Sequence, residues 1–230
     1  PLDAAVAVRS DGHLVGDGSV GETMLSWIYG TEDDARELMP RHRALLKKYV
    51  GEDSVNECVQ ANGTRQLRVT RAPFRRFLQA LGVERKRSHE KRVPHALFQA
   101  PADAQVGFLR GLFGADGCIV NQEAKGTRYA GLGTRSAALA QDVQKMLLLF
   151  GVQSTIYVSE RTQSNFSYTT VDGEERSYAG RAMSYDLRIS GPSLERFART
   201  VGFSLSRKSD KALEVVESHA FYRENPAVSI

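Results

Sequence analysis

The chain has 230 residues, of which 41% are hydrophobic and 25% are charged, and its net charge of +4 is mildly basic. This length can bury a substantial core, and the two cysteines, Cys58 and Cys118, cannot form a zinc site by themselves. Because no run of about 18 apolar residues and no secretory leader is visible, we expect an intracellular protein rather than a membrane or secreted one. The charge permits nucleic acid as a partner without requiring it.

The first half of the chain alternates predicted helices with short predicted strands. Thr31 is a good N-cap for the second helix, and Pro40 inside that helix predicts a kink or a break into two. Asn62-Gly63 is a strong signal for a hairpin turn. The expected elements are a helix at 3–15, a strand at 23–29, a helix at 32–49, strands at 55–60 and 66–70, and a helix at 73–81.

The second half repeats this order. Residues 67–77 align without gaps with residues 187–197, an offset of 120, whereas Asp17 and Asp116 are 99 residues apart. The second half therefore contains about 21 extra residues, which fit best at 162–181 as an extended hairpin loop. Its other expected elements are strands at 118–121 and 128–134, a helix at 137–150, strands at 154–160 and 183–189, and a helix at 192–201. Two such copies predict a pseudo-two-fold molecule.

Two short motifs mark the start of the two copies, at residues 12–18 and 109–117. Each has two small residues four apart, followed by Asp and then by a Gly suited to a left-handed helix cap. Small residues at this spacing allow two helices to approach closely, which places Asp17 and Asp116 side by side. Two carboxylates at helix C-termini repel each other, so a divalent cation between them is the specific interpretation, and an ordinary Asp-Gly turn is the alternative.

Residues 109–117, Leu-Arg-Gly-Leu-Phe-Gly-Ala-Asp-Gly, closely match the motif that gives the LAGLIDADG homing endonucleases their name, and the chain resembles this family from Gly12 to about Leu213. Ser10 and Asp11 depart from the family, which has apolar residues there. The resemblance implies an α/β (α+β) fold of two pseudo-symmetric αββαββα repeats, with saddle-shaped antiparallel sheets and two central motif helices. The expected divisions are repeats at 1–100 and 101–213 and a C-terminal extension at 214–230 towards a missing splicing domain.

The resemblance is strongest to the endonuclease domains of inteins. Lys91 opens a Lys-x-x-Pro segment, and Lys208 follows a Gly-Phe pair, as in two sequence blocks of those domains. The implied activity is site-specific, magnesium-dependent cleavage of double-stranded DNA, with Mn²⁺ as a substitute. Asp17 and Asp116, with Gly16 and Ala115 beside them, would bind the metal, and each Asp would serve one strand. Lys91 and Lys208 would each lie at one active centre and offset developing negative charge.

A long, polar-faced sheet can enter the major groove of DNA, and basic residues near the ends of strands suit phosphate contacts. The implied partner is a long, asymmetric double-stranded target bound by a monomer. The candidate DNA-binding residues are Arg65, Arg68, Arg71, Arg75, Arg128, Arg135, Tyr157, Arg161, Arg188 and Arg207. For each of them, a solvated strand or loop side chain is the alternative.

Two other functions fit the same residues. A relative that binds DNA but has lost cleavage is favoured by Ser10 and Asp11 and disfavoured by the presence of both Asp and both Lys candidates. An RNA partner, as in intron maturases, is the second alternative. Self-splicing is not expected, because the sequence begins without Cys, Ser or Thr and Asn225 lies between Glu224 and Pro226 instead of in a His-Asn pair.

Overall fold

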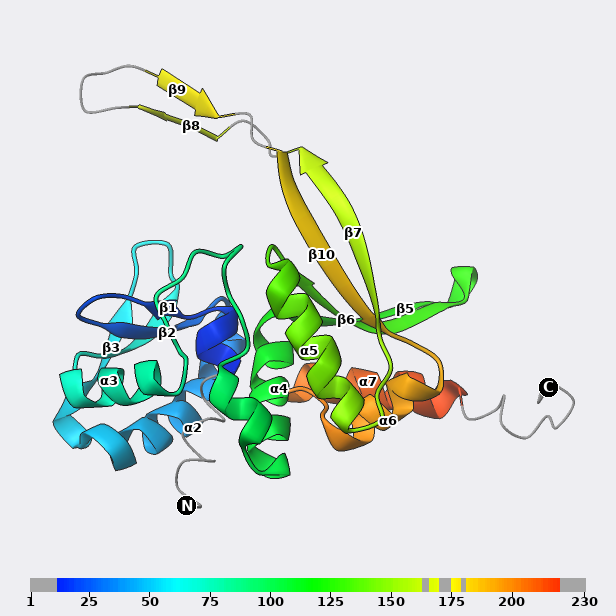
Figure 1. Ribbon diagram of the computed structural model, residues 1–230, viewed down its shortest axis with the longest axis horizontal. Coiled ribbons are helices and arrows are strands. Elements are labelled where there is room, and N and C mark those ends of the chain that lie inside the picture. The colour runs from blue at the N-terminus through cyan, green and yellow to red at the C-terminus, as the bar shows by residue number, and fades with distance from the viewer. Residues whose placement is uncertain (1–11, 163–165, 170–174, 179–180, 220–230) are drawn as a thin grey trace, which may run out of the picture.

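The computed structural model describes residues 12–162, 166–169, 175–178 and 181–219, and the side chains of residues 161–182 and 219 lie outside this description. Most of the helix predicted at 3–15 also lies outside it, and residues 12–16 are helical. In Figure 1, two sheets form the upper layer of the molecule and helices cover them from below. This arrangement confirms the predicted fold of two α+β repeats.

The first half contains one four-stranded antiparallel sheet with the order β1-β2-β4-β3. The predicted hairpin turn is confirmed, because Gly63 has a positive φ of 82° and its N–H donates to the Gln60 carbonyl at 2.9 Å. The elements are β1 (Ser19–Val20), β2 (Leu25–Tyr29), α2 (Glu32–Val50), the 3₁₀ turn η1 (Glu52–Ser54), β3 (Val55–Val59), β4 (Arg65–Val69) and α3 (Ala72–Ala80).

The second half contains a corresponding sheet with the order β5-β6-β10-β7. The extra residues include a separate two-stranded ribbon of β8 (Phe166–Thr169) and β9 (Glu175–Tyr178), as the predicted hairpin loop requires. The remaining elements are η2 (His95–Gln99), α4 (Ala102–Asp116), β5 (Gly117–Gln122), η3 (Glu123–Lys125), β6 (Thr127–Thr134), α5 (Ala137–Leu149), β7 (Thr155–Thr162), β10 (Arg181–Ile189), α6 (Pro192–Thr200) and α7 (Ser206–His219).

Helix α2 shows how local sequence forms these elements. Its N-cap Thr31 accepts a hydrogen bond from the Asp34 N–H at 3.1 Å, which satisfies one of the free donors of the first turn. The predicted break at Pro40 is wrong, because α2 continues through this residue. Pro40 lies on the exposed side of the helix, where water can solvate the carbonyl that has lost its donor.

The buried apolar residues form two cores, one under each sheet. The first motif helix lies between them, because Leu14 packs in the first core and Val15 packs in the second. The segment that connects the halves contributes Val93 to the second core, and Leu205 from the second half packs in the first core. Each half therefore contributes apolar residues to the hydrophobic core of the other half.

The predicted divisions at 100 and 213 both fall within packed structure. The connecting segment before α4 packs on the second core through Val93 and Leu97. Helix α7, which the sequence analysis did not predict, continues through residue 213 to His219, with Val215 and Val216 buried in the same core. Residues on either side of each division therefore share one hydrophobic core.

Candidate active site and nucleic-acid interface

The candidate site begins with the close contact between the helix at 12–16 and α4. A Cβ atom at Gly12 would lie 2.0 Å from the Phe108 carbonyl oxygen, and one at Gly16 would lie 2.8 Å from Ala115 Cβ. Any larger residue at Gly12 would collide with backbone atoms of α4. The small residues of both motifs therefore allow the two helices to pack backbone against backbone, as their spacing predicts.

The glycine after each Asp has a different role from the predicted one. Gly117 has φ −81° and ψ 158°, and Gly18 is not among the glycines with positive φ, so the prediction of left-handed caps is wrong. A Cβ atom at Gly18 would lie 2.3 Å from the Leu14 carbonyl oxygen, and one at Gly117 would lie 2.4 Å from the Phe113 carbonyl oxygen. Glycine is needed because the chain crosses its own last helical turn.

The carboxylates of Asp17 and Asp116 meet where the two helices end. Part of the Asp116 side chain is exposed, but the surrounding protein removes much of its hydration. This burial, together with the charge of Asp17 and a hydrogen bond between the two side chains, raises the pKa of Asp116 to about 7. The charges of Lys91 and Lys208 act in the opposite direction. The pair is thus a site where a cation would replace a shared proton.

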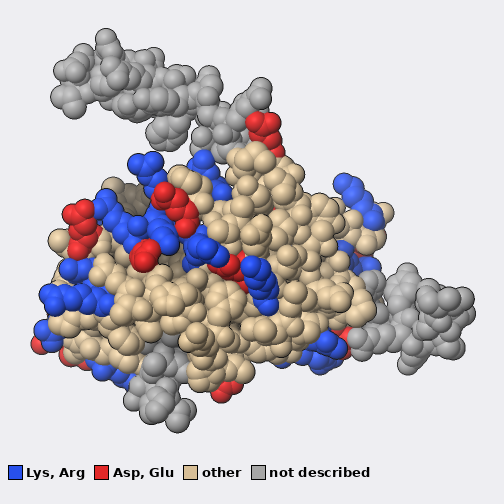
Figure 2. Space-filling view, viewed as in Figure 1, with Lys and Arg blue, Asp and Glu red and all other residues tan. Residues whose placement is uncertain are grey.

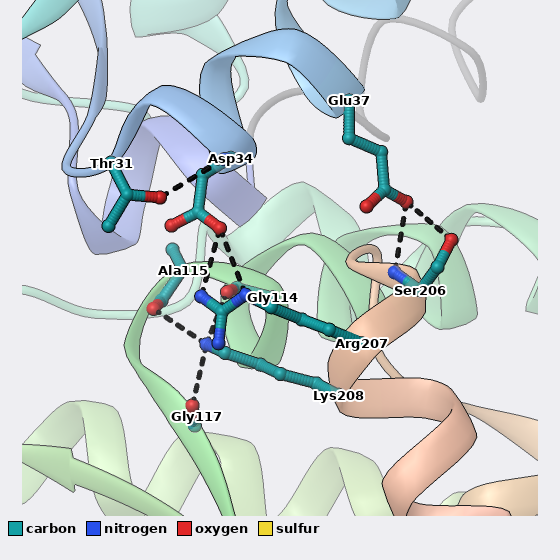
Figure 3. A network of polar contacts seen from close by, with 9 residues as sticks. All are labelled: Thr31, Asp34, Glu37, Gly114, Ala115, Gly117, Ser206, Arg207 and Lys208. Atoms are coloured by element: carbon teal, nitrogen blue, oxygen red, sulfur yellow. Dashed lines mark hydrogen bonds and ion pairs between the residues drawn. The ribbon is translucent and has the colours of Figure 1, made fainter.

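The two lysines bind the backbone at the ends of the same helices. Lys91 Nζ donates to the Gly16 carbonyl at 2.6 Å. Lys208 Nζ donates to the carbonyls of Gly114 at 2.6 Å, Gly117 at 2.7 Å and Ala115 at 3.2 Å, and Figure 3 shows it lying against the end of α4. A cation at a helix C-terminus is favourable because it offsets the dipole. Burial, and then the charge of Arg207, lower the pKa of Lys208.

The donor set at this site is small. Within the described residues, no group of three or more His, Cys, Asp and Glu side chains could hold a metal ion. The carbonyls of Gly16 and Ala115, which were predicted metal ligands, accept hydrogen bonds from the lysines. Two carboxylates nevertheless fit Mg²⁺, which keeps several waters and commonly takes its other oxygens from substrate phosphates. Repulsion by Asp17, which adds to burial in raising the pKa of Asp116, favours the same cation.

The faces of the two sheets that no helix covers form the candidate nucleic-acid interface. Strand side chains alternate between faces, so Arg68 lies opposite the buried Leu67 and Val69. In the second sheet, the Arg188 guanidinium lies 4.5 Å from the ring centroid of Tyr129 and 4.7 Å from that of Tyr157. Arg188 thus packs between two aromatic rings, an arrangement worth about 0.5–1 kcal/mol per pair at an exposed site.

Two residues of this cluster were not predicted. Tyr129 contacts Arg188 from β6, and Asp186 accepts a hydrogen bond from Arg188 Nε at 2.7 Å. The alternation of side chains along β6 and β10 places Tyr129 and Asp186 on the uncovered face. The contact between Tyr129 and Arg188 also depends on the antiparallel register, which pairs Arg188 with Gly131 and Thr155. Nothing in the local sequence specifies that register.

Two predicted DNA-binding arginines share the covered face of their sheets. Arg65 lies on the same side of β4 as Leu67, and it pairs with Glu57 at 3.2 Å and with Glu32 of α2 at 3.8 Å. Arg128 lies on the same side of β6 as the buried Ala130, and its Nε donates to Asn121 Oδ1 at 3.0 Å. The alternation along each strand directs both side chains towards the helices, so neither lies on the uncovered face that forms the candidate interface.

Three more of the predicted arginines bind other groups of the protein. Arg71 donates to the Val50 carbonyl at 3.2 Å, Arg75 donates to the Thr23 carbonyl at 2.9 Å, and Arg207 pairs with Asp34 at 2.9 Å. Arg135 is exposed just after β6. Arg161 belongs to β7, and its side chain lies outside the described residues.

The loop that leads to Lys91 is strongly basic. A cavity of about 320 Å³ lies beside the helix at 12–16, and this loop supplies its cationic lining. Figure 2 shows basic side chains gathered on the upper left of the face in view, with acidic side chains among them. Some of this charge is already paired, since Lys86 pairs with Glu84 at 2.9 Å and Arg85 pairs with Glu22. The basic residues that line the cavity are Arg85, Lys86, Arg87, Lys91 and Arg92.

Comparison with protein families places a known domain on the second half. Residues 103–202 match the family model of the LAGLIDADG-like domain, which covers α4 and its Asp116. None of the helices in the described part of the chain has the length and apolar content that a membrane crossing requires.

Curated relatives match most of this chain with a small part of their own length. The chain is 35% identical over 167 residues to tRNA-splicing ligase RtcB of Pyrococcus abyssi, which covers 64% of this chain and 18% of the ligase. It is 30% identical over 226 residues to the replicative DNA helicase DnaB of a Nostoc species, with coverage of 93% and 23%. Replication factor C small subunit of Methanocaldococcus jannaschii is 25% identical over 220 residues, with coverage of 95% and 10%. The chain thus spans less than a quarter of each.

Solved structures share the whole fold. The structure of I-DmoI in complex with DNA and Ca has a TM-score of 0.60 and 15% identity, and the match covers 93% of this chain and 98% of I-DmoI. The N-terminal LAGLIDADG domain of DUF199/WhiA has a TM-score of 0.50 and 13% identity, with coverage of 87% and 82%. At these identities the likeness concerns the arrangement of helices and sheets.

Proposed function

We propose that the chain is a site-specific double-strand DNA endonuclease that uses a divalent metal, with Mg²⁺ as the expected ion and Mn²⁺ as a substitute. The observation that carries this proposal is the pair of carboxylates, Asp17 and Asp116, at the ends of two packed helices, with one lysine at each helix end. I-DmoI, whose fold is shared over most of this chain, is a homing endonuclease whose structures include complexes with DNA and Mn and with DNA and Ca.

The proposed roles follow from the chemistry of each group. Asp17 and Asp116 would hold the metal, and Asp116 would lose its proton on binding because its pKa is about 7 in the metal-free chain. A metal held by these carboxylates would activate a water and stabilise the leaving oxygen. Lys91 and Lys208 offset the negative charge that develops on the scissile phosphates. Each lysine lies at the end of a different motif helix, so we assign one lysine and one strand to each centre.

The uncovered sheet faces would bind the duplex on either side of the site. Arg68 on the first sheet, and Arg188 with Tyr157 on the second, are the candidates for contacts with base edges. Because one chain contains both sheets and both carboxylates, a monomer suffices for a double-strand cut. The two sheets differ in strand length and side chains, which favours a long target without symmetry.

An origin within an intein is the second part of the proposal. Proteins with unrelated names, a tRNA-splicing ligase, a DNA helicase and a replication factor subunit, each match this chain over less than a quarter of their length. A segment shared by such different proteins is typical of a mobile insertion. The residues for self-splicing are not part of this proposal.

The experiment is a cleavage assay on supercoiled plasmids that carry the uninterrupted genes for RtcB, DnaB and the replication factor C small subunit. The unaltered chain should linearise at least one plasmid in Mg²⁺ or Mn²⁺ and should leave it intact in EDTA. Tight binding to a plasmid fragment without nicking in either metal would contradict cleavage and favour a DNA-binding relative. A preference for structured RNA over duplex DNA would favour the maturase alternative.

A further inference from the structure

An arginine next to each candidate lysine forms an ion pair with the opposite half of the molecule. Arg92 follows Lys91 and donates two hydrogen bonds to Asp142, both at 2.9 Å. Arg207 precedes Lys208 and pairs with Asp34 at 2.9 Å. In both pairs the lysine binds the end of a motif helix and the arginine binds an Asp of the other half. This repeated arrangement indicates that the two arginines have the same role.

The first of these contacts fastens Lys91 to the second half. The Lys91 amine binds Gly16 in the first motif helix, whereas its own carbonyl accepts a hydrogen bond from Ser136 Oγ at 2.6 Å. Ser136 is the N-cap of α5, and Asp142 lies in the same helix with only 4% of its side chain exposed. We call the Arg92–Asp142 ion pair, together with the Ser136 hydrogen bond, the first clasp.

The second contact fastens Lys208 to the first half, and Figure 3 shows its members together. The Lys208 amine binds the end of α4, whereas Arg207 pairs with Asp34 in the first turn of α2. Beside it, the N–H and the hydroxyl of Ser206 both donate to Glu37 Oε1, at 2.9 and 2.7 Å. We call the Arg207–Asp34 ion pair, together with the Ser206–Glu37 hydrogen bonds, the second clasp.

We propose that Arg92 with Asp142, and Arg207 with Asp34, are positioning pairs that hold Lys91 and Lys208 at the two cleavage centres. The proposal rests on the proposed function. A lysine side chain is a flexible point charge, so its value in a transition state depends on how well its backbone is fixed. Each clasp fixes the backbone beside one lysine. The lysine amine binds a motif helix of one half, and the partners of the clasp belong to the other half. Each centre is then complete only when the two halves are docked.

This assignment changes the role predicted for Arg207. The sequence suggested a contact with DNA, but its guanidinium makes two hydrogen bonds with Asp34, at 3.2 and 2.9 Å. Asp34 is itself well placed, because it lies in the first turn of α2 and its N–H is capped by Thr31. Arg92 makes the equivalent contact with the buried Asp142, so neither arginine needs DNA to be ordered.

The first test measures how accessible the amines of Lys91 and Lys208 are to acetylation in the chain without metal or DNA. Acetic anhydride at limiting concentration is followed by mass spectrometry of peptides that contain Lys91 and Lys208, with the exposed Lys125 as the reference amine. Arg207→Gln and Asp34→Asn should each increase acetylation of Lys208 several-fold and leave Lys91 unchanged. Arg92→Gln should do the reverse. Unchanged reactivity of both lysines in folded variants would overturn the proposal.

The second test reads cleavage of each strand of a plasmid that the unaltered chain linearises. Variants of one clasp should slow one strand on the order of 10- to 100-fold, as expected for a displaced rather than absent group, and variants of the other clasp should slow the opposite strand. Arg207→Lys and Arg92→Lys, which keep the charge, should recover part of the rate. Arg199→Gln, which removes an exposed ion pair with Glu195, is the matched control and should change neither strand.

The outcomes separate the two proposals. If clasp variants slow both strands equally, or if Asp34→Asn and Arg207→Gln only lower thermal stability, the clasps are structural ion pairs and the inference fails. If the unaltered chain cuts no plasmid, the proposed function fails, and the acetylation measurement still decides whether the clasps position the lysines. Asp34→Asn keeps the size of the side chain, so it remains informative if Arg92→Gln does not fold.

Discussion

The two halves agree at the helix ends and differ at the sheets. At the helix ends, each half supplies one Asp, one lysine on backbone carbonyls and one arginine clasp. At the sheets, β3 and β4 have 5 residues each, whereas their counterparts β7 and β10 have 8 and 9, and Figure 1 shows β7 and β10 rising beyond the helices. The part that would perform chemistry repeats, and the part that would read sequence does not.

The repetition at the helix ends is itself unequal in detail. Lys91 Nζ donates to one carbonyl, whereas Lys208 Nζ donates to three. In the clasps, the Asp142 side chain is 4% exposed and that of Asp34 is 16% exposed. We therefore expect Lys208 to be held more firmly by its helix, and Lys91 to depend more on its clasp.

The largest effect is expected from the carboxylates, where the halves should behave alike. Asp17→Asn and Asp116→Asn each remove a negative charge with little change of shape, so cleavage should fall by at least about 100-fold while binding to the target remains. Plasmid cleavage and fluorescence anisotropy would measure the two properties. Full cutting by either variant would remove the metal-site assignment.

A smaller effect is expected on the sheets, where the halves should differ. Arg188→Gln should weaken target binding by about 1–3 kcal/mol if Arg188 reads a base, and Arg68→Gln should do so at positions on the other side of the site. Arg65→Gln is the matched control, because Arg65 lies on the covered face of the same strand as Arg68. Equal losses for Arg65→Gln and Arg68→Gln would contradict the assignment of faces.

Salt dependence tests the same surface as a whole. If the uncovered faces and the basic loop contact phosphates, the logarithm of the affinity should fall linearly with the logarithm of salt concentration, by about 0.9 per phosphate neutralised. Anisotropy titrations on one duplex at several salt concentrations would measure the slope. A flat response would argue against DNA as the partner.

A separate effect is expected on the stability of the metal-free chain. The pKa of Asp116 rises from 3.8 to about 7 on folding, so the folded state binds this proton more tightly than the unfolded state does. The stabilisation is fully present below pH 3.8 and is lost as the pH rises through about 7. In EDTA, the melting temperature of the unaltered chain should fall relative to that of Asp116→Asn between pH 5 and pH 8. A constant difference would contradict the raised pKa.

The repeat made most of the fold predictable from the sequence. Strands such as Leu25–Tyr29 and capped helices such as Glu32–Val50 are predicted within a few residues of their observed bounds. Helix α7 was missed because its first residues, Ser206-Arg207-Lys208, are polar, and its apolar positions become evident only against the second core. Strand β1, with two residues, carries no periodic signal.

The candidate site was predictable where spacing alone determines geometry. The motifs placed Asp17 and Asp116 together because small residues fix how closely the two helices pack. The roles of the arginines depend on the partners that each side chain meets. Arg65 and Arg68 are three residues apart in one strand, yet one pairs with Glu57 on the covered face and the other lies on the uncovered face. Such partners come from distant segments, which local patterns do not specify.

The most direct test of the central claim, that each helix end cuts one strand, is a plasmid time course with saturating Lys91→Ala or Lys208→Ala. Removal of one charge-stabilising donor should slow one strand on the order of 100-fold and leave affinity nearly unchanged, so nicked circles should accumulate. The nicks should lie on opposite strands in the two variants. Equal slowing of both strands, without nicked circles, would contradict the claim. Both lysines would then be ordinary contacts to DNA phosphates.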